Sequence, residues 1–235
     1  MTFFVRFLQR YTEDTNFKRT IFMESIERTV AKSLLDIKAV MLRPEKPFVW
    51  ASGWHSPIYC DNRRILSYPQ LREQVCRWMA DNIISRYPDV EVIAGVATGA
   101  IAHGVLIAHF LGKPFIYVRP KPKDHGTGSQ IEGILNEGAK TVVVEDLIST
   151  GSSSLSAVAA LEKAGADVLG MVAIFSYNFN QSRRAFENAN VELNTLTNYD
   201  ALIEVASETG YIKESDLGLL KEWRFSPSTW GQEAQ

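Results

Sequence analysis

The sequence predicts an α/β protein built on a central parallel sheet with helices on both of its faces. Mostly apolar runs, such as residues 168–177, alternate with segments whose apolar residues recur at helical spacing, such as residues 152–164. Strands that are apolar on both faces need cover on both sides, which is the arrangement of parallel sheets in α/β proteins. The length of 235 residues and the hydrophobic fraction of 46% fit one domain with small additions.

The N-terminal part, residues 23–88, is expected to form a helical and β-rich cap. A helix is predicted over residues 23–42, because apolar residues recur at helical spacing, at Ile26, Val30, Leu34, Ile37 and Met41. Pro44 and Pro47 end this pattern. Residues 48–64 carry strand-forming and turn residues, and residues 68–87 return to a helical pattern.

The α/β core is expected over residues 89–235, within a single domain that spans residues 23–235. Its predicted strands cover residues 90–98, 114–119, 141–147, 168–177 and 191–195. Its predicted helices cover residues 100–111, 152–164 and 182–189, with a further helix from Tyr199 onward. A polar, glycine-containing stretch lies at residues 121–132, and the chain after Arg224 is expected to trail over the surface.

Residues 1–22 are predicted to be an extension ahead of the folded domain. They lack an uninterrupted apolar segment and a small-residue cleavage site, which argues against a secretory signal. Met23 follows them and opens the helical pattern. One hypothesis is therefore that Met23 is the true start and that residues 1–22 are not native.

Composition narrows the class of partner and the compartment. The formal net charge of -2 gives no overall positive field for nucleic acid, so a small molecule or a protein is favoured as partner. Every apolar run is shorter than the ~20 residues that span a bilayer, so no membrane association is expected. Cys60 and Cys76 do not form a CxxC pair, and we interpret both as reduced thiols of a cytoplasmic protein.

The segment 142–155 carries the strongest chemical signal. An apolar strand ends in Glu145 and Asp146, and a loop of serine, threonine and glycine at residues 149–153 leads into a helix. Backbone N–H groups at a helix start, with hydroxyl groups beside them, bind phosphate. The two carboxylates would repel that phosphate unless they faced something else, such as ribose hydroxyls. An ordinary strand–turn–helix with a capping serine is the alternative.

A basic stretch precedes this segment. It holds three cations, a histidine and two glycines: Arg119, Lys121, Lys123, His125, Gly126 and Gly128. Such a loop could meet the negative charge that develops on a departing pyrophosphate, and its glycines would let it close and exclude water. A solvated basic loop without function is the competing interpretation. Other nucleotide signatures fail: Val105 stands where a P-loop needs lysine, and no G-x-G-x-x-G occurs.

The acid pair followed by a Ser/Thr/Gly loop resembles the phosphoribosyl pyrophosphate (PRPP) signature of the type I phosphoribosyltransferases, in the form found in orotate phosphoribosyltransferases. The resemblance implies the type I phosphoribosyltransferase fold and a catalytic set of Lys123, His125 and Asp146. It also implies that Glu145 and Asp146 bind the hydroxyls of the ribose. It implies that the 5-phosphate is bound by residues 149–153. The PRPP-binding set implied is Arg119, Lys121, Lys123, His125, Glu145, Asp146, Leu147, Ile148, Ser149, Thr150, Gly151, Ser152 and Ser153.

Two further segments extend the resemblance. The turn 95–100 matches one that helps bind pyrophosphate in related enzymes, although simple turn chemistry explains it equally well. Residues 52–61 resemble the segment that distinguishes orotate enzymes, with His55 where a lysine is common; Pro120 likewise replaces a common lysine. Ser149 and His55 are the expected orotate contacts. No arginine lies directly beyond residues 175–179, so the partner of the orotate carboxylate stays unassigned.

The resemblance implies a pentosyltransferase that joins orotate to PRPP, giving orotidine 5-monophosphate and pyrophosphate in pyrimidine biosynthesis. It implies magnesium as cofactor, held mainly through substrate rather than by a protein metal site, and a homodimer whose subunits share the active site. Two alternatives stay open. One is a phosphoribosyltransferase for a purine or another base, and the other is a non-catalytic regulator that senses PRPP and binds nucleic acid.

Overall fold

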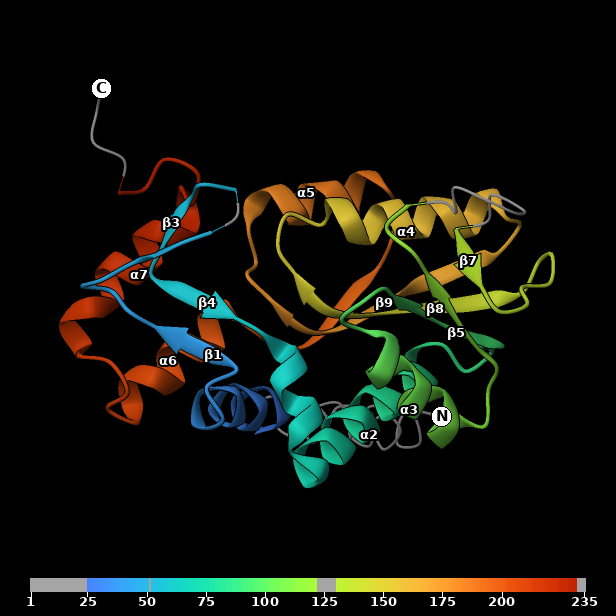
Figure 1. Ribbon diagram of the computed structural model, residues 1–235, viewed down its shortest axis with the longest axis horizontal. Helices are drawn as coiled ribbons and strands as arrows, with labels where there is room; N and C mark the ends of the chain where they lie inside the picture. Colours follow the sequence, from blue (N-terminus) through green and yellow to red (C-terminus); the bar gives the residue numbers. More distant parts are fainter. Residues whose placement is uncertain (1–24, 51, 122–129, 232–235) are drawn as a thin grey trace, which may run out of the picture.

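A six-stranded sheet forms the centre of the computed structural model, which describes residues 25–50, 52–121 and 130–231 (Figure 1). The strand order is β10-β9-β8-β5-β6-β7. All neighbouring pairs are parallel except β6 and β7. The strands are β5 (Val92–Val96), β6 (Phe115–Val118), β7 (Ile131–Glu132), β8 (Lys140–Ile148), β9 (Asp167–Ser176) and β10 (Leu193–Asn198).

Helices cover both faces of this sheet, as the apolar strands require. Figure 1 shows α2 (Pro69–Arg86) and α3 (Ile101–Leu111) on one face, and α4 (Ser152–Lys163) and α5 (Asn180–Asn188) on the other. Alternate residues of a strand therefore enter different cores. Val142 and Val144 pack with the α2 and α3 side, whereas Val143 packs with the α4 and α5 side.

The structure corrects two predictions about elements. The first helix covers residues 25–36 rather than continuing to residue 42, and Met41 lies in strand β1 (Val40–Leu42). Lys38 has a φ of 57°, outside the helical region, and β1 pairs antiparallel with β4 (Ile58–Cys60). The second correction is β7, which lies antiparallel at the sheet edge, within a stretch for which no strand was predicted.

The segment 48–56 and the C-terminal helices pack together beside the sheet. Strands β2 (Phe48–Val49) and β3 (His55–Ser56) lie near α6 (Tyr199–Glu208) and α7 (Leu217–Phe225) (Figure 1). Trp223 of α7 is fully buried, and its indole Nε1 donates to the backbone oxygen of His55 at 3.2 Å. The short helices η1 (Asn62–Ser67) and η2 (Glu214–Asp216) complete the description.

Residues expected to form the N-terminal cap therefore divide between two places. The helix α2 covers the sheet beside α3, whereas the strands β1 to β4 pack with the C-terminal helices. Cys60 and Cys76 are free thiols, as predicted. Among the helices that the structure describes, none is long and apolar enough to cross a membrane.

Candidate active site

The candidate site lies where the strand order of the sheet reverses. The chain passes from β5 to β6 on one side of β5 and then places β8 on the other side. In open α/β sheets, ligands bind at such a switch point, beyond the carboxyl ends of the strands. The turn 97–100 follows β5, while the acid pair lies in the last part of β8 and is followed by residues 149–153, so the fold brings the two predicted segments together.

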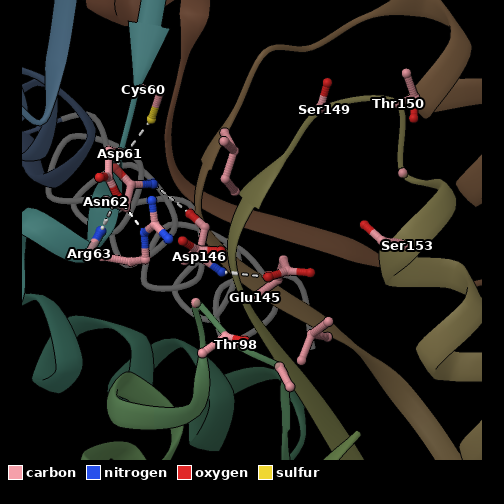
Figure 2. A pocket seen from close by; sticks show the side chains of 15 residues that line it. Cys60, Asp61, Asn62, Arg63, Thr98, Glu145, Asp146, Ser149, Thr150 and Ser153 are labelled. Atoms are coloured by element: carbon pink, nitrogen blue, oxygen red, sulfur yellow. Dashed lines mark hydrogen bonds and ion pairs between the residues drawn. The ribbon is translucent and has the colours of Figure 1, made fainter. Parts of the chain in front are cut away.

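A cavity of about 480 Å³ occupies this position (Figure 2). Its walls come from three stretches of the chain, around residues 60–63, 96–99 and 145–153. The residues that line it are Cys60, Asp61, Asn62, Arg63, Val96, Ala97, Thr98, Gly99, Glu145, Asp146, Leu147, Ser149, Thr150, Gly151 and Ser153. Its polar walls and its size suit a polar small molecule.

One wall is the segment that joins β8 to α4, here called the β8–α4 loop (residues 149–153). Gly151 precedes α4 with a φ of 84°, a left-handed conformation that glycine adopts without strain. A Cβ at this position would also lie 3.0 Å from the Phe186 ring. The loop thus turns tightly into the start of α4, where unpaired backbone N–H groups favour an anion.

The two acids at the end of β8 have different surroundings. Glu145 is 5% exposed, and its carboxylate accepts hydrogen bonds from the Ser154 hydroxyl and from the backbone N–H of Asp146, both at 3.0 Å. Burial, and then the neighbouring Asp146 carboxylate, raises the pKa of Glu145 well above its ordinary value. Asp146 is more accessible than Glu145, and its backbone oxygen accepts a hydrogen bond from Asn62 at 2.6 Å.

The turn after β5 fits closely against Asp146. A Cβ built on Gly99 would overlap the Asp146 carboxylate. The backbone of Gly99 is not in the left-handed region, so glycine is required here for space rather than for conformation. The peptide bond between Ala97 and Thr98 is cis. Residues 97–99 line the cavity, and Figure 2 shows Thr98 next to the acid pair.

Arg119 lies on the far side of this turn. It lines a second, smaller cavity of about 90 Å³, and this cavity shares Val96, Ala97 and Ser153 with the larger one. Its backbone N–H donates to Gln130 at 2.9 Å, and its guanidinium lies 3.8 Å from Glu132. Arg119 is therefore held at the base of the predicted basic loop, next to the start of α4.

The other predicted site residues are placed as follows. Leu147, Ser149, Thr150, Gly151 and Ser153 line the larger cavity. Ile148 is fully buried beneath the loop, and Ser152 is exposed at the first position of α4, where it accepts a hydrogen bond from Thr150 at 3.3 Å. Lys121 is exposed. Lys123 and His125 lie outside the described residues, as does the extension predicted at residues 1–22.

His55, the second expected orotate contact, does not line the cavity. Its imidazole Nδ1 lies 3.1 Å from the backbone oxygen of Gly231, in the C-terminal segment. The structure thus separates His55 from Ser149, the other residue predicted to contact orotate. Its role in binding orotate stays a prediction from the resemblance.

Two cavity residues were missed from the sequence. Asn62 is fully buried and joins η1 to the end of β8 through its hydrogen bond to Asp146, and Arg63 brings a positive charge to the cavity. Residues 60–63 are called the η1 wall below. Arg63 itself was the sequence signal that could have revealed the η1 wall. A cavity that is lined by several carboxylates needs a cation if it is to bind an anion.

Comparisons with known proteins show the family of the chain. The model of the phosphoribosyl transferase domain family matches residues 63–203, more than half of the chain. The fold and the site thus define the class as the type I phosphoribosyltransferases.

The relatives narrow the class further. The chain is 53% identical to the orotate phosphoribosyltransferase of Porphyromonas gingivalis over 89% of this chain and 100% of that one. It is 55% identical to that of Lactococcus lactis subsp. lactis over 88% and 99% of the two chains. The crystal structure of orotate phosphoribosyltransferase from Aeropyrum pernix has a TM-score of 0.67 and 28% identity, covering 78% and 99%. The chain belongs to the orotate phosphoribosyltransferase family.

Proposed function

We propose that this protein transfers the 5-phosphoribosyl group of PRPP to orotate, forming orotidine 5-monophosphate and pyrophosphate in pyrimidine biosynthesis. The observation that carries the proposal is the cavity at the switch point of the sheet. In it, the acid pair of β8 lies directly beside the β8–α4 loop at a helix N-terminus. This arrangement suits a ligand that joins a phosphate to a diol, which is the chemistry of a phosphorylated ribose.

We place each part of the donor against one wall of the cavity. The β8–α4 loop takes the 5-phosphate, and the carboxylate of Asp146 accepts hydrogen bonds from ribose hydroxyls. Glu145 supports Asp146, because one of its carboxylate oxygens already receives the Asp146 N–H. The pyrophosphate lies along the turn 97–100 and is met by Arg119 and by the loop that carries Lys121, Lys123 and His125.

The reaction is a substitution at C1 of the ribose. A ring nitrogen of orotate forms the new bond as the bond from C1 to pyrophosphate breaks, and positive charge grows on the sugar ring. The carboxylate of Asp146 stabilises that charge, while the cations of the basic loop stabilise the leaving group. No side chain has to act as a strong base, since orotate can bind with this nitrogen already ionised.

Magnesium is the proposed cofactor. The cavity offers hard oxygen ligands, including the carboxylates of Asp61 and Asp146 and the hydroxyls of the β8–α4 loop. This donor set fits a cation that prefers oxygen and usually binds together with substrate phosphates. Asp146 is the residue placed to help hold it. Bound there with PRPP, magnesium would neutralise charge on the pyrophosphate.

A homodimer with a shared active site is proposed from the family resemblance, in which the basic loop of one subunit reaches the cavity of the other. The cytoplasm is the proposed compartment, and the two free thiols support this assignment. Size-exclusion chromatography with light scattering would test the dimer. A mass of one chain at the concentrations used for turnover would contradict it.

An assay with a panel of bases tests the proposed activity. Purified protein, PRPP and magnesium are mixed with orotate, uracil, adenine, guanine or hypoxanthine, and pyrophosphate release is followed. Among these bases, we expect only orotate to cause release of pyrophosphate. We expect this release to stop when magnesium is chelated. Release with a purine and not with orotate would establish the second candidate. Retention on DNA at moderate salt with no release from any base would favour the regulator.

A further inference from the structure

More negative than positive side chains line the cavity. Three carboxylates, those of Asp61, Glu145 and Asp146, meet one cation, Arg63, among the lining residues of this cavity. Both proposed substrates are anions, and orotate carries its negative carboxylate directly on the pyrimidine ring. The carboxylate must therefore find a cation or donors on the wall against which the base lies.

The phosphates of the donor have partners elsewhere. Figure 2 shows the β8–α4 loop on one side of the acid pair and the η1 wall on the other. Arg119 lies beyond the turn 97–100, in the second cavity that includes Ser153. The two described arginines of the site thus lie apart, with Arg119 in the second cavity beside the start of α4 and Arg63 on the η1 wall. With the 5-phosphate at residues 149–153 and the ribose at Asp146, as proposed above, the base extends toward the η1 wall.

Arg63 is held through its Nε atom, which leaves its two terminal guanidinium nitrogens able to bind a ligand. It stands in η1, and its Nε donates to Asp61 Oδ1 at 2.6 Å. Its two terminal nitrogens have no hydrogen-bond partner within residues 25–50, 52–121 and 130–231, and its side chain is 61% exposed. The hydrogen bond to Asp61, with the Asp61 charge, also raises the pKa of the Arg63 guanidinium, so the cation persists at any working pH.

We propose that Arg63 binds the carboxylate of orotate, and that Asp61 orients its guanidinium for this contact. The inference rests on the proposed function and adds a specificity-determining residue to it. A planar guanidinium can form two parallel hydrogen bonds with a carboxylate, whereas an ammonium group cannot. A base without the carboxylate, such as uracil, leaves this cation without its partner. Arg63 thereby selects orotate over uracil.

Two nucleotides that differ only in this carboxylate provide the test. Orotidine 5-monophosphate and uridine 5-monophosphate are titrated into the dimeric protein by calorimetry, without PRPP or turnover. The wild type is expected to prefer orotidine 5-monophosphate by about 10- to 100-fold, the range for a hydrogen-bonded charged pair. Arg63→Gln should reduce this preference to about onefold, and Arg63→Lys should restore only part of it.

Arg64→Gln is the matched control. Arg64 is the adjacent arginine, it is exposed, and it does not line the cavity. We expect this variant to keep the wild-type preference. Circular dichroism melting of all variants checks that each is folded. An effect of Arg64→Gln equal to that of Arg63→Gln would overturn the proposal.

Two further results would also overturn it. One is a wild type without preference. The other is an Arg63→Gln variant that retains the preference, including one that binds both nucleotides more weakly by the same factor, since that would indicate a structural role. A loss of PRPP affinity with an unchanged preference would instead assign Arg63 to pyrophosphate. Wild-type turnover with orotate, measured in parallel, separates these outcomes from a failure of the proposed function itself.

Discussion

At the scale of single residues, Glu145 and Asp146 are neighbours with different surroundings. Successive side chains of a strand point to opposite faces of the sheet. Of two adjacent acids, therefore, one faces the cavity at the end of the strand and the other is buried. Glu145 is buried with two hydrogen bonds to its carboxylate, while Asp146 lies against the turn at Gly99. We infer that Asp146 contacts the donor directly and that Glu145 fixes its position.

Asp146→Asn tests the first of these roles. Loss of the charge that faces the sugar should lower kcat/KM by about 10²- to 10³-fold, the cost of removing one electrostatic group from a transition state. The melting temperature should fall by no more than about 2 °C, because the side chain does not pack in a core. Asp167→Asn, at the exposed start of β9, is the control and should leave both quantities unchanged. Near-normal turnover in Asp146→Asn would contradict the assignment.

Glu145→Gln tests the second role through pH. The pKa of Glu145 is raised in the folded protein, so the folded state binds this proton more tightly than the unfolded chain does. The associated stability is fully present below the ordinary value of 4.5 and is lost as pH rises above it. Glutamine mimics the protonated form: its amide oxygen can accept from the Asp146 N–H, and its amide NH2 can donate to the Ser154 hydroxyl.

The melting temperature of Glu145→Gln, relative to the wild type, should therefore rise as pH increases from about 4.5 toward 8. Scanning fluorimetry over this range measures the difference directly. At the acidic end the two proteins should melt together. A difference that is constant with pH, or that falls, would show that burial does not penalise the charge of Glu145.

Site residues could be predicted from the sequence where they are contiguous in the chain. The acid pair and the β8–α4 loop were predicted because strand, acids and loop are contiguous, and they line one cavity. Asn62 was missed because its contribution depends on contact with Asp146, more than eighty positions away in the chain. Arg63 was missed because it reaches the cavity through the packing of η1 against β8. No local pattern reports such a contact. The roles predicted for His55, Lys123 and His125 stay predictions.

At the scale of elements, the turn after β5 shows how closely two segments approach. Gly99→Ala should push the Asp146 carboxylate out of place while leaving the backbone unstrained. We expect kcat/KM to fall by about 10-fold or more, as misplacement of a positioned group does, with a small change in melting temperature. Gly218→Ala, where a Cβ meets nothing within 4 Å, should leave activity unchanged. Equal activity of the two variants would show that the turn does not position Asp146.

The elements also show where sequence patterns mislead. Met41 continues the helical spacing of the first helix, yet it lies in β1, because the backbone turns at Lys38 and the next residues pair with β4. Periodicity cannot distinguish the last turn of a helix from a short strand when the deciding contact is a distant strand. The core strands β5, β8 and β9 were predicted because their apolar runs are long and are buried on both faces.

At the scale of the whole molecule, the site is incomplete without segments that are far apart in the chain. Residues 60–63, 96–99 and 145–153 meet only because β5 and β8 are adjacent and η1 packs beside them. The proposed dimer extends this principle, since the basic loop would complete the site of its partner. The fold class could be predicted from the sequence pattern. The position of the η1 wall beside the acid pair depends on the topology of the sheet and could not be predicted in this way.

Mixing two inactive variants tests the shared site. Lys123→Ala and Asp146→Asn are each expected to be nearly inactive as separate dimers. Exchange of subunits would give hybrid dimers in which one of the two sites carries neither change. The mixture should regain about a quarter of wild-type activity, since half of the dimers are hybrids with one intact site. No recovery, after exchange has been verified with labelled subunits, would show that each site is built from one chain.

The most direct measurement of the central claim is a crystal structure of the protein with PRPP and magnesium. We predict that the 5-phosphate lies against residues 149–153 at the start of α4, with ribose hydroxyls hydrogen-bonded to Asp146. A 5-phosphate bound at another place, or a ribose that does not contact the acid pair, would contradict it.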